Sequence, residues 1–394
     1  MLNMKTIKFV LLVVILSFGM YLRVDDIYDH EMTSNEFHYA SEAPFVIPNY
    51  YFFWKYHTHP KDLKTYLSNL EKHTNPDYRI QGTYPLIMQG HPTLFPLLIS
   101  IFPKKIGWHL KDPSSAKFIN KTPEGYVLND MSPKGVQLIK VYRDGSVLLL
   151  INGGDARIIS VIFGTLMILI IFIVSKTFYN EKIAYMSSII FSFSPPIVDM
   201  IKLSDNESVM VLFLFIAICL YVRAFETKKY KSFILAGLFH GLAMGTKFTA
   251  FGIFPIIIIY MMITKKLLDL KILSSFIISF IILSLFSNPV SAIQEVISPS
   301  HLKVNGVEGY IANLNQYPII FSLSLLSYLF ISGYKVKNVD KMLIVYLLFF
   351  SFMPFLISYR QYVIAPPAVI IFSAVTVRNI HVIISKLSTL HSSS

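Results

Sequence analysis

The sequence predicts an all-α membrane protein that crosses the bilayer about ten times, since several apolar runs approach the roughly 20 residues that one crossing needs. Composition supports this fold class. The 394 residues are 54% hydrophobic and only 15% charged, and the mean hydropathy of +0.56 lies well above that of soluble domains. Short connectors rich in lysine and arginine separate the apolar runs, as in the loops of multi-pass proteins.

Charge and cysteine content exclude some other classes. A formal net charge of +12 would fit a nucleic-acid-binding protein, but the cations lie beside apolar runs, which is the pattern of membrane topology. We therefore expect no nucleic acid partner. The single cysteine, Cys219, rules out a disulfide within the chain and says nothing about the redox compartment.

The apolar runs are expected to be helices, because in lipid each backbone polar group must be satisfied within its own segment. The expected spans are residues 6–22, 156–175, 183–201, 208–225, 232–246, 249–264, 272–288, 318–334, 342–357 and 363–380. No small-residue cleavage site follows the first run, so we expect an uncleaved anchor rather than a secretory signal.

The distribution of cations predicts the orientation. With a cytoplasmic N-terminus, sixteen cations fall at inner ends: Lys5, Lys8, Lys176, Lys182, Arg223, Lys228, Lys229, Lys231, Lys265, Lys266, Lys271, Lys335, Lys337, Lys341, Arg378 and Lys386. The outer connectors between the later spans keep Lys202, Lys247, Lys303 and Arg360. This bias predicts a cell-membrane protein with both termini in the cytoplasm.

The same orientation divides the chain into four regions. Residues 1–22 form the first transmembrane helix, 23–155 a large extracytoplasmic loop, 156–380 a region of nine transmembrane helices and 381–394 a short, frayed cytoplasmic tail. We also expect a short helix near residues 62–73 of the loop.

Two further elements are expected inside the loop. Residues 90–102 form an apolar run too short to span, which predicts a helix lying in the membrane interface. Residues 136–142 and 146–151 flank Arg143-Asp144-Gly145, and Asp-Gly between two strand-like runs predicts a β-hairpin. The loop is thus expected to form a small α+β subdomain.

Four groups of polar residues are expected at the outer ends of spans, where charge near lipid marks a functional site. They are Arg23 with the run from Asn35 to Ala40, His91-Pro92, the run from Lys202 to Glu207, and Lys247 with Arg360. In the predicted orientation all four lie at one membrane surface.

The order of several short motifs resembles a known superfamily. Arg23 is followed 12 residues later by Asn35-Glu36-Phe37-His38-Tyr39, then by His91-Pro92-Thr93-Leu94 and by Ala156-Arg157-Ile158-Ile159-Ser160. These motifs resemble those of the GT-C glycosyltransferases, in particular the protein O-mannosyltransferase and aminoarabinose-transferase branch. In that family the second of these motifs is typically Asp-Glu-x-x-Tyr, and the third is His-Pro-Pro-Leu.

Later motifs continue the resemblance in the same order. Ser194-Pro195 leads to Lys202 and then Glu207, where the family has a basic residue and an Asp. The run from Gly237 through Gly241 to Thr246-Lys247 is similar to the family's Gly-x-x-x-Gly-x-x-x-x-Thr-Lys, and residues 360–366 are similar to its late Arg-Tyr-Pro. The resemblance implies a GT-C fold over nearly the whole chain.

The resemblance also implies a reaction. Such enzymes move a sugar, with inversion, from a polyprenyl-phosphate carrier to a protein or a lipid-linked glycan at the outer face. A carboxylate of the first loop is the general base on the acceptor hydroxyl, and fixed cations such as Lys247 and Arg360 stabilise the phosphate that leaves. Asn35 stands where the family has its catalytic Asp, and an amide is not a base. Glu36 is therefore the first candidate, and Asp29 and Glu31 could substitute.

The remaining residues of the expected site are substrate-binding candidates. They are Arg23, Tyr39, His91, Lys202, Asp205, Glu207, Lys247, Arg360 and Tyr362. No cofactor is expected. A divalent cation held by carboxylates near His30 and His38 stays an alternative, although their spacing matches no ligand pattern.

Two other functions remain open. A lipid or polysaccharide transporter would usually show internal repeats and charges within its spans, and neither is visible in the sequence. An inactive homologue that serves as a membrane scaffold is compatible with Asn35.

Overall fold

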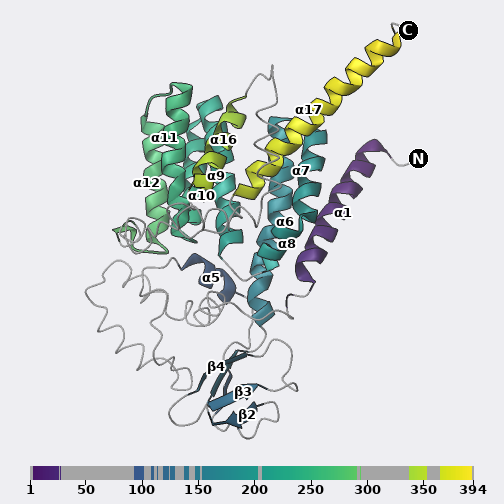
Figure 1. Ribbon diagram of the computed structural model, residues 1–394. Coiled ribbons are helices and arrows are strands. Elements are labelled where there is room, and N and C mark those ends of the chain that lie inside the picture. Colours follow the sequence, from purple (N-terminus) through teal and green to yellow (C-terminus); the bar gives the residue numbers. More distant parts are fainter. Residues whose placement is uncertain are drawn as a thin grey trace.

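The computed structural model describes part of the chain. The described residues are 3–25, 27, 93–101, 108–110, 113, 119–123, 125–128, 137–141, 147–150, 153–202, 206–290, 293, 337–352 and 364–392. Most of them form helices that run side by side, and Figure 1 shows α5 and the strands at the end of these helices that lies away from both chain termini.

The helices follow the expected apolar runs. Their bounds are α1 Met4–Val24, α5 Leu94–Ser100, α6 Gly153–Phe178, α7 Glu181–Phe193, α8 Pro195–Lys202, α9 Glu207–Thr227, α10 Tyr230–Met244, the 3-10 helix η5 Phe248–Gly252, α11 Ile253–Thr264, α12 Leu270–Ser284, α16 Asn338–Phe352 and α17 Ala365–Ser392. Nine of the ten expected spans contain helix, and the tenth, residues 318–334, lies outside the described residues.

The helices differ in whether their length and composition allow them to cross a membrane. Among the described residues, Met4–Val24, Arg157–Phe178 and Glu207–Thr227 are long and apolar enough to cross a membrane, and Phe248–Thr264, Leu270–Ser284 and Ala365–Arg378 are shorter apolar helices. Crossing by all ten expected spans therefore stays a prediction. Hydropathy alone does not give the end of α17: the helix continues to Ser392, beyond residue 380, where the span was expected to end.

The expected β-hairpin is confirmed. β4 (Gln137–Val141) pairs antiparallel with β5 (Val147–Leu150), with Val141 opposite Val147 and a register shift between Leu138 and Lys140. The sequence did not indicate β1 (Trp108–Leu110), which adds to β5 and gives the sheet order β1-β5-β4. It also did not indicate a second hairpin of β2 (Ile119–Thr122) and β3 (Gly125–Leu128).

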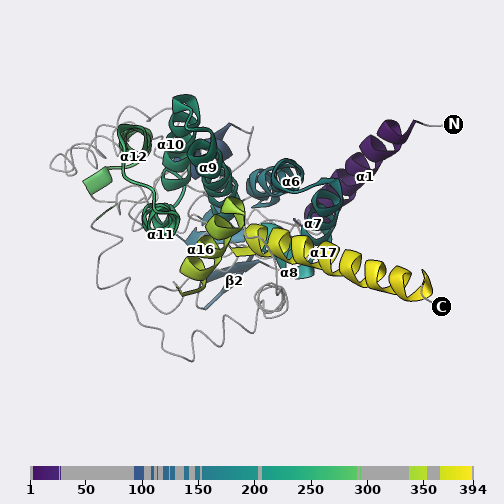
Figure 2. The same ribbon diagram turned by 90° about the horizontal axis from the view of Figure 1, so that it is seen from above.

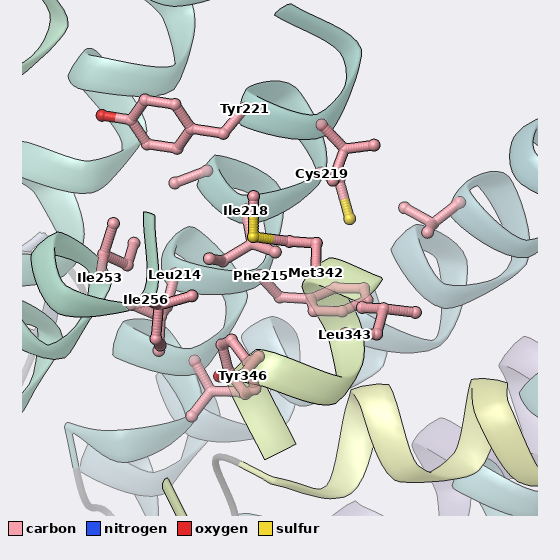
Figure 3. Packing of buried hydrophobic residues seen from close by; sticks show 14 of the residues in the cluster. Leu214, Phe215, Ile218, Cys219, Tyr221, Ile253, Ile256, Met342, Leu343 and Tyr346 are labelled. Carbon is pink, nitrogen blue, oxygen red and sulfur yellow. The ribbon is translucent and has the colours of Figure 1, made fainter. Parts of the chain in front are cut away.

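The centre of the helical region is α9, which is apolar all round and is covered on most sides. A helix of this kind belongs in an interior. Figure 3 shows α9 side chains such as Phe215 and Ile218 packed between α11 and α16, which contribute Ile256 and Met342 among others. Viewed from above, α10, α11 and α12 surround α9 at one side, whereas α1 and α17 lie at the other (Figure 2).

Candidate functional site

The described site candidates gather at one end of the helices, the end that carries α5. Arg23 lies near the C-terminal end of α1, and Lys202 is the last residue of α8. Glu207 begins α9, and Lys247 follows α10. We call this the α5 end, and the opposite end, which carries both termini in Figure 1, the terminus end.

Glu207 and Lys247 form an ion pair at the α5 end. Lys247 Nζ lies 2.7 Å from Glu207 Oε1, with side-chain exposures of 27% for the lysine and 6% for the glutamate. Glu207 lies in the first turn of α9, where the helix dipole favours a negative charge. Lys247 is therefore a partly exposed cation anchored by a buried carboxylate.

Hydrogen bonds to the residue before Lys247 fix the chain at this point. The Asn206 amide Nδ2 donates to the carbonyl of Thr246 at 3.1 Å, and Thr246 Oγ1 donates to the carbonyl of Leu242 at 2.9 Å. Lys247 itself is extended, with φ −156°, and leads directly into η5. Asn206 and Glu207 thus hold two consecutive residues of the α10–η5 connection.

Close packing of α10 on α12 fixes the position of Lys247 just past the end of α10. Gly237, Gly241 and Gly245 repeat every four residues and so share one face of α10. A Cβ at Gly237 would lie 2.3 Å from the Ser275 carbonyl oxygen, and one at Gly241 would lie 2.6 Å from that of Ser279. Small residues at this spacing let two helix backbones approach closely in a membrane. The glycines of the motif therefore position the lysine that ends it.

The segment after His91-Pro92 is attached to the same two helices. The Thr93 amide and Oγ1 both donate to the Phe286 carbonyl, at 3.0 and 2.9 Å, and the Leu94 amide donates to the Gly245 carbonyl at 3.1 Å. These carbonyls lie just past the C-terminal ends of α12 and α10. Within the expected run 90–102, a helix is confirmed from Leu94 to Ser100, and its Leu94, Phe95 and Ile99 are buried in the protein. Its location in the membrane interface stays a prediction.

Thr93 is notable because the family resembled here has proline at this place. Proline has no N–H and no hydroxyl, so neither bond to Phe286 could form. This chain instead uses both donors of Thr93, which ties the start of α5 to the end of α12.

Arg23 binds backbone carbonyls of its own helix and of α7. Its Nη1 donates to Gly19 O at 2.7 Å and to Ser192 O at 3.2 Å, and Nη2 donates to Phe191 O at 3.1 Å. In an unbroken helix the amides of residues 195 and 196 would serve the carbonyls of 191 and 192.

Residues 195 and 196 are both proline, which has no amide N–H. Arg23 therefore supplies the donors that the two prolines lack. The single expected span at 183–201 is in fact two helices, α7 and α8, broken at Ser194.

Arg157 closes the base of the long loop. Its Nη1 donates to Ile27 O at 2.6 Å, and its side chain is buried. Ile27 follows α1 and Arg157 lies near the start of α6, so this bond joins the two ends of the segment between those helices. Arg157 belongs to a motif of the sequence, but nothing in that motif indicates its partner, 130 positions away.

Other site candidates lie outside the described residues. They are Asp29, Glu31, Asn35, Glu36, Tyr39, His91, Asp205, Arg360 and Tyr362. Lys202 is described and half-buried at the end of α8. The structure thus brings Glu207 and Lys247 together, and the roles of the others stay predictions.

No group of three His, Cys, Asp or Glu side chains within the described ranges could hold a metal ion. His30, His38 and the carboxylates beside them fall outside those ranges, so the alternative of a divalent cation in the first loop stays open. Among the described residues, Lys202 and Lys247 are partly exposed cations at the α5 end, and Lys121 of β2 is also exposed at this end. A partly exposed ammonium of this kind can bind a phosphate oxygen.

The middle of the chain is similar to one enzyme family. Residues 147–292 match the dolichyl-phosphate-mannose-protein mannosyltransferase family. No curated protein matches the chain. The matched segment covers little more than a third of the chain; it contains Arg157, Lys202, Glu207 and Lys247, but neither Arg23 nor the carboxylates of residues 29–36.

Proposed function

We propose that this protein is an integral membrane glycosyltransferase. It would transfer a sugar from a polyprenyl-phosphate donor to a hydroxyl of a protein or of a lipid-linked glycan, at the extracytoplasmic face. The observation that carries the proposal is the Lys247–Glu207 pair, which lies inside the segment similar to mannosyltransferases and beside the bound start of α5.

The proposed step is a displacement at the anomeric carbon of the sugar. The acceptor oxygen forms a bond to this carbon while the bond from the carbon to the phosphate oxygen breaks, which inverts the configuration. The hydroxyl proton passes to a carboxylate, and polyprenyl phosphate leaves with the bonding electron pair. The negative charge on the leaving phosphate grows during the step, so a fixed cation beside it lowers the barrier.

Lys247 is the proposed cation for this phosphate, with Arg360 as a second. A bound carboxylate holds the ammonium in place before the donor arrives, so that little reorganisation is needed during the reaction. The ammonium has three donor hydrogens, and Glu207 Oε1 accepts from it. Lys202, Asp205, Tyr362, His91 and Tyr39 are the other proposed substrate-binding residues.

Arg23 differs from these in what surrounds it. Three hydrogen bonds of its guanidinium go to backbone carbonyls, which favours a role in positioning α1 against α7 and α8. We therefore propose that Arg23 positions the helices around the site and that neighbouring residues contact the substrate.

Glu36 is the proposed general base, with Asp29 and Glu31 as substitutes. The adjacent Asn35 stands in the position of the family's aspartate and is assigned to acceptor binding, since an amide donates and accepts hydrogen bonds but does not take the proton. Loss of a general base typically lowers a rate by about 10²–10⁴-fold.

A transfer assay tests the proposal. Membranes that carry the protein are incubated with labelled polyprenyl-phosphate sugars, and incorporation into protein and glycolipid is counted. We expect Glu36→Gln to lower transfer by about 10²-fold or more and Lys247→Met by about 10²-fold, with each rate expressed per amount of protein in the membrane. Lys182→Gln, an exposed lysine at the terminus end, is the matched control and should keep full activity. Transfer unaffected by Glu36→Gln and Lys247→Met would refute the assignment.

One observation supports a second candidate. Asn35 in place of an aspartate fits an inactive homologue that acts as a scaffold. In that case no donor in the panel gives transfer, and Asn35→Asp creates activity where the wild type has none. A transporter would instead move labelled lipid between leaflets without forming a glycosidic bond.

A further inference from the structure

Three leucines are strongly exposed at the terminus end. Leu267 and Leu268 lie between α11 and α12, and Leu270 begins α12; their exposures are 88%, 62% and 80%. Such side chains in water lose the free energy that burial of apolar surface provides. A contiguous exposed apolar patch rimmed by polar residues is typical of an interaction site.

Six lysines surround these leucines in sequence and space. Lys265, Lys266 and Lys271 flank the leucines, Lys228 and Lys229 form the neighbouring connection between α9 and α10, and Lys231 lies in the first turn of α10. The acidic residues beside them are Glu226, in the last turn of α9, and Asp269, in the α11–α12 connection, so the surface is strongly positive. We call the six lysines and three leucines the lysine–leucine patch.

Hydrogen bonds hold the two connections of the patch together. Lys266 Nζ donates to the Phe225 carbonyl at 3.0 Å, and Lys271 Nζ donates to the Lys228 carbonyl at 2.9 Å. The first bond starts in the α11–α12 connection and the second in the first turn of α12, and both reach the C-terminal end of α9. The patch is therefore a fixed surface of the fold rather than two independent loops.

The backbone of the patch places lysine where glycine is usual. Lys228 and Lys265 end α9 and α11 with φ of 55° and 52°, in the left-handed region that glycine normally occupies after a helix. A non-glycine residue is strained there. The chain nevertheless carries a cation at both positions, which points to a use for the charge.

The apolar part of the patch continues the outer faces of the two helices below it. Leu273, Ile277 and Ile281 are exposed along α12, and Met262 and Ile263 are exposed at the end of α11. Figure 2 shows both helices at the edge of the bundle. The exposed faces of apolar helices in a membrane protein contact lipid, so the leucines lie where such a face meets the headgroup region.

We propose that the lysine–leucine patch binds anionic lipid headgroups at the terminus end. The leucines enter the boundary between headgroups and acyl chains, as in interfacial segments, and Lys228, Lys229, Lys231 and Lys265 bind the lipid phosphates. The excess of lysine over carboxylate selects anionic over zwitterionic lipid, since each cation near an anionic surface strengthens the attachment. This inference is independent of the proposed transfer reaction, which lies at the other end of the helices.

A fluorescent label at the patch tests whether it meets lipid. The chain's one cysteine, Cys219, is buried, so Leu268→Cys offers the accessible thiol for an environment-sensitive fluorophore. The labelled protein is placed in nanodiscs of phosphatidylcholine alone or of phosphatidylcholine with phosphatidylglycerol. We expect blue-shifted emission in both and a larger shift with phosphatidylglycerol, which added salt weakens. Emission typical of water in both would overturn the proposal and would indicate a protein partner for this face.

A second measurement tests the lysines without relying on the label. Protein extracted from mixed nanodiscs in mild detergent is assayed for the phosphatidylglycerol that it retains. Lys229→Gln with Lys231→Gln should lower retention several-fold, whereas Lys5→Gln with Lys182→Gln, an equally exposed pair at the same end, should leave it unchanged. Equal loss in both pairs would mean a general effect of charge and would contradict a defined patch. Unchanged far-ultraviolet circular dichroism confirms that each variant is folded.

Discussion

The two ends of the helical region use basic residues in opposite ways. At the α5 end, Arg23 and Arg157 are buried and bind carbonyls of distant segments. At the terminus end, Lys271 and Lys337 are more exposed and bind the carbonyls of Lys228 and Phe178, which lie at or just past the last turns of α9 and α6.

The difference teaches what each set of cations does for the fold. A cation at a helix C-terminus gains from the helix dipole and stays in contact with water, so each adds little. A buried guanidinium that satisfies several carbonyls becomes indispensable, because its removal leaves those groups desolvated without partners. Lys271 and Lys337 of the terminus end are therefore individually replaceable, whereas Arg23 and Arg157 of the α5 end are not.

The largest expected effect is that of Arg23→Met. The Phe191 and Ser192 carbonyls then stay buried without these hydrogen-bond donors, because Pro195 and Pro196 have no N–H to replace them. The loss should lower the free energy of unfolding by about 3 kcal/mol. Lys271→Met at the terminus end should cost less than about 1 kcal/mol. The thermal midpoint of the protein in detergent compares the two. Similar losses would remove the contrast between the ends.

Gly237→Ala should have the next largest effect. Its Cβ would meet the Ser275 backbone oxygen, so α10 and α12 must separate, at a cost of about 2 kcal/mol. Lys247 moves with α10, and sugar transfer should fall as well. Gly19→Ala is the comparison, because there the new Cβ meets the terminal Cδ1 methyl of Ile168 at 2.7 Å, the far end of a side chain that can change rotamer. A larger loss of thermal stability for Gly19→Ala than for Gly237→Ala would contradict this account.

Thr93→Val should cost about 1 kcal/mol, because the hydroxyl bond to Phe286 is lost while the amide bond stays. The loss should be local, with faster hydrogen exchange at Leu94 and the rest of α5. Thr177→Val, which removes an exposed hydroxyl bond to Ile173 near the terminus end, should leave exchange in α5 and the thermal midpoint nearly unchanged. Equal protection of α5 in both variants would show that Thr93 does not hold it.

The smallest effect concerns Glu181 at the terminus end. Hydrogen bonds from Lys8 and Lys176 lower the pKa of this carboxylate from 4.5 to about 2. Since the folded state has the lower pKa, its stabilisation is full above pH 4.5 and is lost as the pH falls from 4.5 toward 2. Glu181→Gln should remove this small acid-dependent change in the thermal midpoint. A midpoint with the same pH dependence in the variant would show that Glu181 does not contribute.

Local patterns predicted much of the fold. Apolar runs gave the positions of the described helices, and Asp144-Gly145 gave the β4–β5 hairpin, since both depend on neighbours in sequence. The hairpin of β2 and β3 escaped because Asn120-Lys121-Thr122 lacks the alternation of apolar residues that marks a strand. The break at Ser194 was hidden by the continuous apolar run, although two consecutive prolines are a recognised stop signal.

The pairings of the candidate site could not be predicted. Glu207 and Lys247 were each candidate substrate-binding residues. They are 40 positions apart, and neither motif indicates that the two side chains form an ion pair. The bond from Arg23 to Phe191 spans 168 positions. An arginine after a first helix and a Pro-Pro pair later in the chain are complementary only once α1 and α7 are known to pack together.

The dependence of α7 and α8 on Arg23 has a consequence for biogenesis. Helix α1 is synthesised well before the prolines emerge from the ribosome, and the two carbonyls above the break have no donor until the first helix meets them. We expect α1 to stay near the insertion machinery until Arg23 binds these carbonyls and stabilises α7 and α8, so that the first helix assists the folding of the later two. A change in α1 that removes these bonds would then lead to degradation of the chain during assembly, before a mature protein forms.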